Sequence, residues 1–130
     1  MKNLLTLTTV IEVGAGLVLV ALPSLPVKLL FGSSLDTSTS LTVGRWAGAA
    51  LLAMGVACWL ARDDGQNRAA TGLVAAMLLY NLAVVLLFAY AGLGSGPVGV
   101  ALWPAVILHA AMALWCIACL RIKRVTVRGQ

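Results

Sequence analysis

Charged residues are scarce in this chain. Asp, Glu, Lys and Arg together account for 10% of its 130 residues, whereas soluble domains carry about 25%. Hydrophobic residues account for 62%. A water-soluble chain of this length could not bury that much apolar surface, so the shortage of charge excludes the soluble globular class. It predicts a protein whose solvent is the lipid bilayer.

Sequence signatures of the common soluble enzymes are also missing. The chain contains no phosphate-binding glycine loop, no nucleophile elbow and no metalloprotease helix motif. The alternating apolar and polar pattern of a membrane β-barrel is absent as well. We therefore identify no catalytic residue and no cofactor. The net charge of +5 requires no nucleic-acid partner, because membrane topology accounts for it.

The chain has instead four long apolar runs, at residues 4–22, 41–61, 69–91 and 98–122. Each run has about the 20 residues that a helix needs to cross a hydrocarbon core roughly 30 Å thick. Backbone groups in the bilayer must be hydrogen-bonded within their own segment, so helices are expected. The sequence predicts an all-α fold: one domain over residues 1–130, forming an antiparallel bundle of four transmembrane helices.

The first two runs are joined by the longest connection, PSLPVKLLFGSSLDTSTS. We expect Pro23 and Pro26 to end the first helix, because proline lacks a backbone donor and disfavours helix in the residue before it. The segment VKLLFG then predicts a short interfacial helix closed by Gly32. The segment DTSTS offers N-cap residues for the second long helix.

Basic residues are distributed unevenly between the two sides of the predicted bundle. With four spans, one side receives Lys2, Arg62, Arg68, Arg121, Lys123, Arg124 and Arg128, whereas the other receives Lys28 and Arg45. Basic residues favour the cytoplasmic side, so we expect a multi-pass protein of the bacterial inner membrane with both termini in the cytoplasm. The basic tail is also suited to anionic lipid headgroups.

Small residues recur in the predicted helices. The second run contains GRWAGAALLAMGVA, with Gly44 and Gly48 four residues apart, and the first run contains GAG at residues 14–16. Because no hydrophobic effect drives helices together in lipid, residues that permit close backbone approach favour helix association. They predict a tight bundle, and the same surfaces are equally suited to a homodimer or a larger membrane complex.

Glu12 is the one acidic residue inside an apolar run. A charge at this depth costs about 2.5–3.5 kcal/mol on insertion scales, so polar groups at mid-depth are expected to contact one another. Each predicted transmembrane helix contributes to such a cluster, whose members are Glu12, Arg45, Tyr80, Asn81 and His109. Glu12 and His109 are the members most able to exchange protons.

The cluster supports two hypotheses. In the first, it is a site for binding, or for proton-coupled transport, of a small or lipophilic molecule, because ionisable residues in a membrane are functional candidates by default. In the second, a buried Glu12–Arg45 pair only determines which helices meet. The protein is then a non-catalytic subunit or assembly factor of a larger membrane complex. The residue types alone leave both hypotheses open.

The cysteines suggest a third alternative, a thiol or metal redox role. Four side chains lie along one stripe of the last predicted helix: His109, Met112, Cys116 and Cys119. Cys58 is expected at a depth similar to that of the two later cysteines. These are soft ligands, but the stripe is about 15 Å long, too long for one ion, and Cys and Met also serve as apolar fillers. We expect no metal and no disulfide.

Two resemblances to known families rest on short stretches. The segments GLVLVALPSL and VGRWAGAALLAMGVACWLA are similar to the DoxX-like small bacterial membrane proteins, in which a Pro after the first helix and an Arg–x–x–Gly start to the second recur. Separately, VIEVGAG resembles the first helix of small multidrug resistance transporters, a match carried by Glu12 and Val13. That resemblance implies a membrane-embedded glutamate that binds protons and cations in turn. The third predicted helix has Tyr80 and lacks the substrate-packing tryptophan of those transporters.

Overall fold

The computed structural model describes residues 1–64, 67–94, 96 and 98–128, with side chains as far as residue 122. Within these residues the protein is all-helical, with five helices and no strand: α1 (Lys2–Ala21), α2 (Ser24–Phe31), α3 (Ser38–Ala61), α4 (Arg68–Leu93) and α5 (Leu102–Arg128). Four segments are long and apolar enough to cross a membrane, namely α1, α3, α4 and Leu102–Ile122 of α5. The predicted all-α fold with four spans is therefore confirmed, and the chain is a multi-pass membrane protein.

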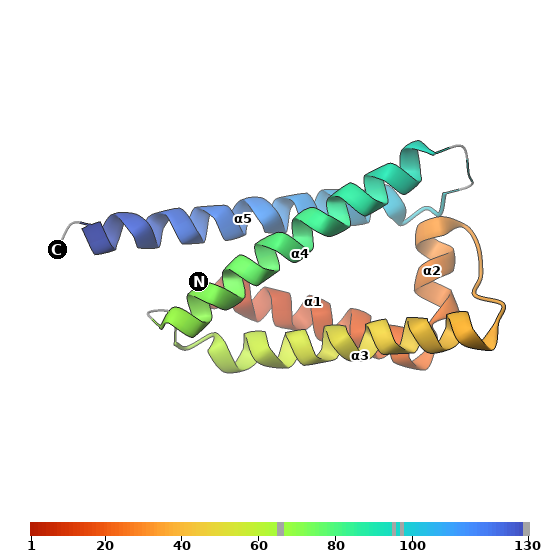
Figure 1. The fold of residues 1–130 in the computed structure, drawn as a ribbon, viewed down its shortest axis with the longest axis horizontal. Helices are drawn as coiled ribbons and strands as arrows, with labels where there is room; N and C mark the ends of the chain where they lie inside the picture. The colour runs from red at the N-terminus through yellow and green to blue at the C-terminus, as the bar shows by residue number, and fades with distance from the viewer. Residues whose placement is uncertain (65–66, 95, 97, 129–130) are drawn as a thin grey trace.

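The long helices are arranged as two antiparallel pairs. α1 packs along most of α3, and α4 packs along α5, whereas the contacts between the two pairs are few (Figure 1). The start of α1, the α3–α4 connection and the end of α5 lie at one end of the molecule, which we call the terminal end. α2 and the α4–α5 connection lie at the opposite end, the α2 end. The bundle is thus uneven, tight within each pair and loose between pairs.

Glycines explain the close contact between α1 and α3. A Cβ on Gly48 would lie 2.8 Å from the carbonyl oxygen of Gly16, and a Cβ on Gly16 would lie 2.8 Å from the carbonyl oxygen of Gly48. Farther along α3, the carbonyl of Gly55 accepts a hydrogen bond of 3.1 Å from the Thr9 hydroxyl. Small residues let these backbones approach as the sequence predicts, and the hydroxyl links the two helices.

α1 ends at Ala21, and α2 begins two residues beyond Leu22. Pro26 does not help to end α1, as the sequence suggested, but occupies the third position of α2. The first-turn amides of a helix have no intrahelical partner, so a proline there removes no hydrogen bond. Gly32 follows α2 in the left-handed conformation, with φ of 71°, which confirms the predicted glycine cap.

Backbone hydrogen bonds join α2 to the start of α5. The amide of Gly99 donates to the carbonyl of Leu30 at 3.0 Å, and the amide of Ala101 donates to the carbonyl of Leu29 at 2.9 Å. These carbonyls belong to the last turn of α2 and would otherwise lack a partner. α2 therefore bridges the α1/α3 pair to the α4/α5 pair at the α2 end.

The first turns of α3 and α5 are specified locally. Thr37 caps α3: its hydroxyl accepts from the amide of Ser40 at 3.1 Å, and the Ser40 hydroxyl accepts from the Thr37 amide at 3.2 Å. The DTSTS segment thus supplies the predicted N-cap through a reciprocal capping box. α5 begins at Leu102, later than the predicted residue 98, so Pro104 lies in its first turn, where proline is tolerated.

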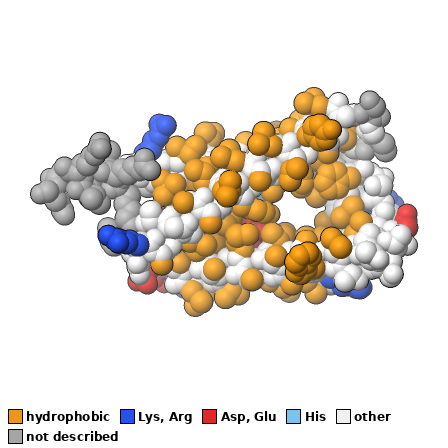
Figure 2. All heavy atoms as spheres, viewed as in Figure 1, with side chains coloured by type: hydrophobic (Ala, Val, Ile, Leu, Met, Phe, Trp, Pro, Cys, Tyr) orange, Lys and Arg blue, Asp and Glu red, His pale blue; other side chains and the backbone are white. Residues whose placement is uncertain are grey.

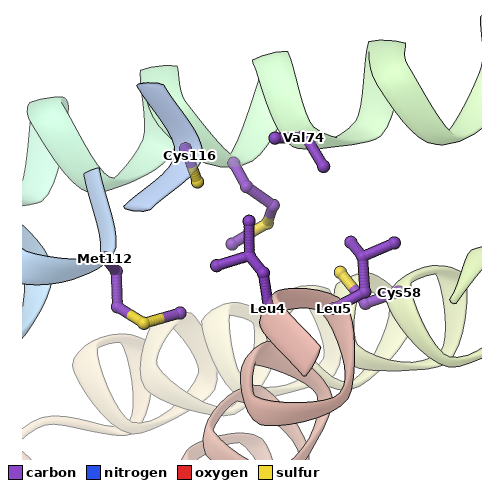
Figure 3. Packing of buried hydrophobic residues seen from close by; sticks show 7 residues of the cluster. Leu4, Leu5, Cys58, Val74, Met112 and Cys116 are labelled. Carbon is purple, nitrogen blue, oxygen red and sulfur yellow. The ribbon is translucent and has the colours of Figure 1, made fainter. Parts of the chain in front are cut away.

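Close to the terminal end, one apolar cluster joins all four long helices (Figure 3). We call it the core cluster; its members are Leu4, Leu5, Cys58, Val74, Met77, Met112 and Cys116. Figure 3 shows Leu4 and Leu5 of α1 reaching between Cys58 of α3 and the residues of α4 and α5. This cluster holds the two helix pairs together at the end of the bundle opposite to α2.

Exposed charges connect the start of α1 to the end of α3. Lys2 contacts the Asp63 carboxylate at 2.7 Å, and Arg62 contacts it at 3.2 Å. These two hydrogen-bonding cations hold the pKa of Asp63 below its usual range. The Arg62 guanidinium also lies 3.0 Å from the centre of the Trp59 ring. Exposed ion pairs contribute little to stability, so the core cluster remains the main contact at this end.

Candidate functional site

Three polar residues form a layer next to the core cluster, on the side toward α2. Their helices contribute Leu5, Val74 and Cys116 to the core cluster, and seven residues farther toward the α2 end lie Glu12, Asn81 and His109. Seven residues of helix rise about 10 Å. We call these three residues, together with Thr8 and Tyr80, the polar layer. Helices α1, α4 and α5 therefore place Glu12, Asn81 and His109 at the same depth of the bundle. This depth is next to the one at which the apolar contacts of the core cluster end.

Asn81 and His109 are joined across α4 and α5. The Asn81 side chain is buried, and its Nδ2 donates to the carbonyl of Met77 at 2.7 Å. Its Oδ1 lies 2.8 Å from Nδ1 of His109. The predicted association of these two residues is therefore present, and it belongs to the contact between α4 and α5.

Aromatic rings extend from His109 toward α2. The Tyr80 ring meets the His109 ring edge to face, with centroids 5.7 Å apart. Phe88 makes the same kind of contact with His109 at 6.2 Å, and Phe31 of α2 meets Phe88 at 5.4 Å. Edge-to-face packing is a favoured arrangement of aromatic rings. The row gives the polar layer an apolar wall on the side of the α4/α5 pair.

Glu12 is buried without a partner. Its side chain is 4% exposed, and it makes no hydrogen bond or ion pair with any residue that the structure describes. One turn earlier on the same face, Thr8 is 1% exposed and its hydroxyl lacks a hydrogen-bond partner among the described residues. α1 thus presents two unsatisfied polar groups.

Beyond the polar layer, in the direction of α2, side chains do not fill the space between the two helix pairs. Figure 2 shows an opening through the molecule between the α1/α3 pair and the α4/α5 pair, lined largely by hydrophobic side chains, with acidic atoms visible beside it. We call this space the inter-pair opening. The core cluster closes it at the terminal end, and α2 closes it at the other end.

Arg45 is not part of the cluster, contrary to the expectation from the sequence. It is exposed on α3, and no ion pair connects it to Glu12 among the described residues. The reason is the register of α1 against α3, in which Gly16 lies against Gly48. In an antiparallel pair this register places Arg45 beside the last turns of α1, about 10 Å from the level of Glu12.

Three further residues complete this region, and the predicted cluster did not include them: Thr8, Phe31 and Phe88. Thr8 precedes Glu12 by one helical turn and Phe88 follows Asn81 by two, so helical spacing alone could have found both. Phe31 carries no such signal, because its contact depends on how α2 folds back onto α4. The region therefore combines a polar layer with an aromatic wall.

The three cysteines lie outside this layer. Cys58 and Cys116 are buried in the core cluster, Cys119 packs against it, and all three are free thiols. No group of three His, Cys, Asp or Glu side chains among the described residues could hold a metal ion. Nothing in their arrangement favours the thiol or metal redox role over apolar packing.

Comparison of the chain with models of known families, with curated proteins and with solved structures finds no match. The resemblances to DoxX-like proteins and to small multidrug resistance transporters gain no support from these comparisons. Function has to be argued from the polar layer and the inter-pair opening.

Proposed function

We propose that the protein binds a small, lipophilic molecule in the inter-pair opening, with Glu12 contacting the polar group of that molecule. The observation that carries this proposal is a carboxyl group inside a membrane span that is 4% exposed and has no partner among the described residues. A charge there costs about 2.5–3.5 kcal/mol. A ligand bearing a complementary group would remove that cost.

The surroundings of Glu12 support a binding site. Ligand pockets are mostly apolar, with a few polar groups that orient the ligand. The inter-pair opening has hydrophobic walls, and the other members of the polar layer supply polar side chains at or near the level of Glu12 along their helices. A proton on the carboxyl would relieve the same cost as a bound cation, so exchange of one for the other provides a route to proton-coupled transport.

Replacing Glu12 by glutamine is expected to abolish binding while leaving the fold intact. Glutamine has nearly the same shape but cannot ionise. The check is native mass spectrometry of the protein released from lipid nanodiscs, which records the small molecules that remain bound. Arg45→Gln is the matched control, because this charge is exposed and lies outside the polar layer. A bound molecule retained equally by Glu12→Gln would contradict the proposed site, and a second protein retained in its place would favour a subunit of a larger complex.

We further propose that the protein lies in the bacterial inner membrane with both termini in the cytoplasm. The supporting feature is that the start of α1, the end of α5 and the α3–α4 connection share the terminal end, where Lys2, Arg62 and Arg68 also lie. The side chains of Lys123, Arg124 and Arg128, which the sequence prediction also used, are outside the described residues.

A reporter that is active only in the periplasm tests this orientation. Fused after Gln130, it is expected to give no signal, because the basic residues hold that end in the cytoplasm. Inserted after Gly96, in the α4–α5 connection, it is expected to give a strong signal. The reverse pattern would overturn the orientation.

A further inference from the structure

The face of α1 that is buried near the terminal end becomes accessible beyond the polar layer. Thr8 and Glu12, which lie on that face, are 1% and 4% exposed. Ala15 and Leu19 follow Glu12 by three and seven residues, so they continue the same face toward α2. Ala15 is exposed, and Leu19, which lies against Gly48 of α3, is half-buried. The other helices therefore stop covering this face of α1 just beyond Glu12.

The inner face of α4 loses its cover at the same level. The buried residues of α4 recur at helical spacing and are Ala70, Val74, Met77 and Asn81. The residues that continue this face toward α2 are all half-buried and are Val84, Val85 and Phe88. Because α1 belongs to one helix pair and α4 to the other, these exposures agree with the inter-pair opening that Figure 2 shows.

Three of the helices beside the opening have no polar side chain at this depth. Residues 13–21 of α1, 82–89 of α4 and 104–108 of α5 are all apolar or glycine. Apolar cavities in proteins stay free of water, and an empty space would deprive the surrounding side chains of dispersion contacts. Hydrocarbon is the material that fills such a space favourably.

The opening lies within one leaflet and faces the bilayer sideways. Glu12 is at the middle of α1, which ends at Ala21. The nine residues between these positions rise roughly 13 Å, close to half of a hydrocarbon core about 30 Å thick. The core cluster and α2 close the two ends of the opening, whereas its sides pass between the helix pairs (Figure 2). Those sides therefore meet lipid chains.

We infer that an acyl chain of a phospholipid in the leaflet at the α2 end lies in the inter-pair opening, and that the ligand reaches Glu12 sideways through the bilayer by displacing this chain. The terminal methyl group of the chain points toward the polar layer, because the headgroup stays at the α2 end. The route of the ligand rests on the proposed function, whereas occupancy by the chain does not. Solutes that do not dissolve in the bilayer have no access by this route.

Two photoreactive phospholipids test the position of the chain. Each carries a diazirine on one acyl chain, close to the ester carbonyl in the first and close to the terminal methyl group in the second. Each is mixed into liposomes that contain the full chain, and fragmentation mass spectrometry locates the adducts formed on irradiation. We expect the methyl-end probe to label Ala15, near the middle of the span, and the carbonyl-end probe to label Leu19, nearer to α2. The opposite order would show that the chain comes from the other leaflet and would overturn the assignment.

Filling the opening separates an inserted chain from lipid at the outer surface. Ala15→Phe adds a ring on the face of α1 that borders the opening, so most of the labelling of Leu19 should be lost. Leu17→Phe is the matched control: Leu17 is 57% exposed and follows Glu12 by five residues, which places it on the opposite side of the helix. This control should keep the labelling of Leu19. Loss of labelling in both variants, or in neither, would contradict an inserted chain.

The wild type alone decides the occupancy if Ala15→Phe does not fold. Adducts confined to outer positions such as Leu17, with none on Ala15 or Leu19, would overturn occupancy by a lipid chain. The binding function stands in that case if native mass spectrometry still finds a molecule that Glu12→Gln loses. Adducts on Ala15 and Leu19 without any such molecule would leave the lipid chain in place and overturn the binding function instead.

Discussion

Alanine in place of Gly48 is expected to destabilise the protein strongly. The added Cβ would lie 2.8 Å from both the Gly16 carbonyl oxygen and the Leu19 Cβ, and 2.9 Å from the Val20 amide nitrogen. Most of these are backbone atoms, which cannot rotate away, so α1 and α3 must separate. Overpacking of this kind costs about 1–3 kcal/mol. Thermal unfolding in detergent, followed by circular dichroism, should show a clear fall in the melting temperature.

Gly72→Ala and Gly14→Ala are the matched controls for this prediction. A Cβ at either position meets nothing within 4 Å, and alanine is about 0.5–1 kcal/mol better than glycine inside a helix. These variants should therefore unfold at the wild-type temperature or above it. A Gly48→Ala variant as stable as Gly72→Ala would show that the close approach of α1 to α3 does not hold the pair together.

The spans could be predicted from the sequence because each is a continuous apolar run whose length matches the bilayer. The helix ends were predicted less accurately, and proline is one reason. Pro26 and Pro104 both lie in first turns of helices, where a missing donor costs nothing, so Pro26 belongs to α2 and does not help to end α1 as the sequence suggested. The apolar run alone does not say on which side of such a proline the helix begins.

Part of the candidate site could also be predicted. Glu12, Asn81 and His109 are polar residues at mid-span, and that feature is visible in the sequence. The position of Arg45 could not be predicted in the same way, because it depends on the register of α1 against α3. That register follows from the contact of Gly16 with Gly48, and the many other small residues allow several alternatives. The division into two helix pairs, and hence the inter-pair opening, is likewise a property of packing and not of any one helix.

Glu12→Leu is expected to raise the thermal stability of the protein and to abolish ligand binding. Leucine has a similar volume, and it replaces a buried carboxyl that has no partner among the described residues. The cost of about 2.5–3.5 kcal/mol for a charge at this depth then disappears. A gain in stability with a loss of function is typical of residues kept for binding. Melting temperatures in detergent, measured with the binding assay, check both effects.

The melting temperature of Glu12→Leu also decides whether the polar layer is a ligand-binding site or only a structural contact between helices. If Glu12 held the helices together through a buried partner, Glu12→Leu would lower the melting temperature, because breaking a buried pair costs about 3–5 kcal/mol.

Thr8 and Thr9 offer a matched comparison of the same kind. The Thr8 hydroxyl has no partner in the part of the chain that the structure describes, whereas the Thr9 hydroxyl donates to the carbonyls of Leu5 and Gly55. Thr8→Val should therefore stabilise, as Glu12→Leu does, and Thr9→Val should destabilise by about 1 kcal/mol. If Thr8→Val and Glu12→Leu both destabilise, the polar layer is structural, and the unsatisfied face of α1 is not a binding surface.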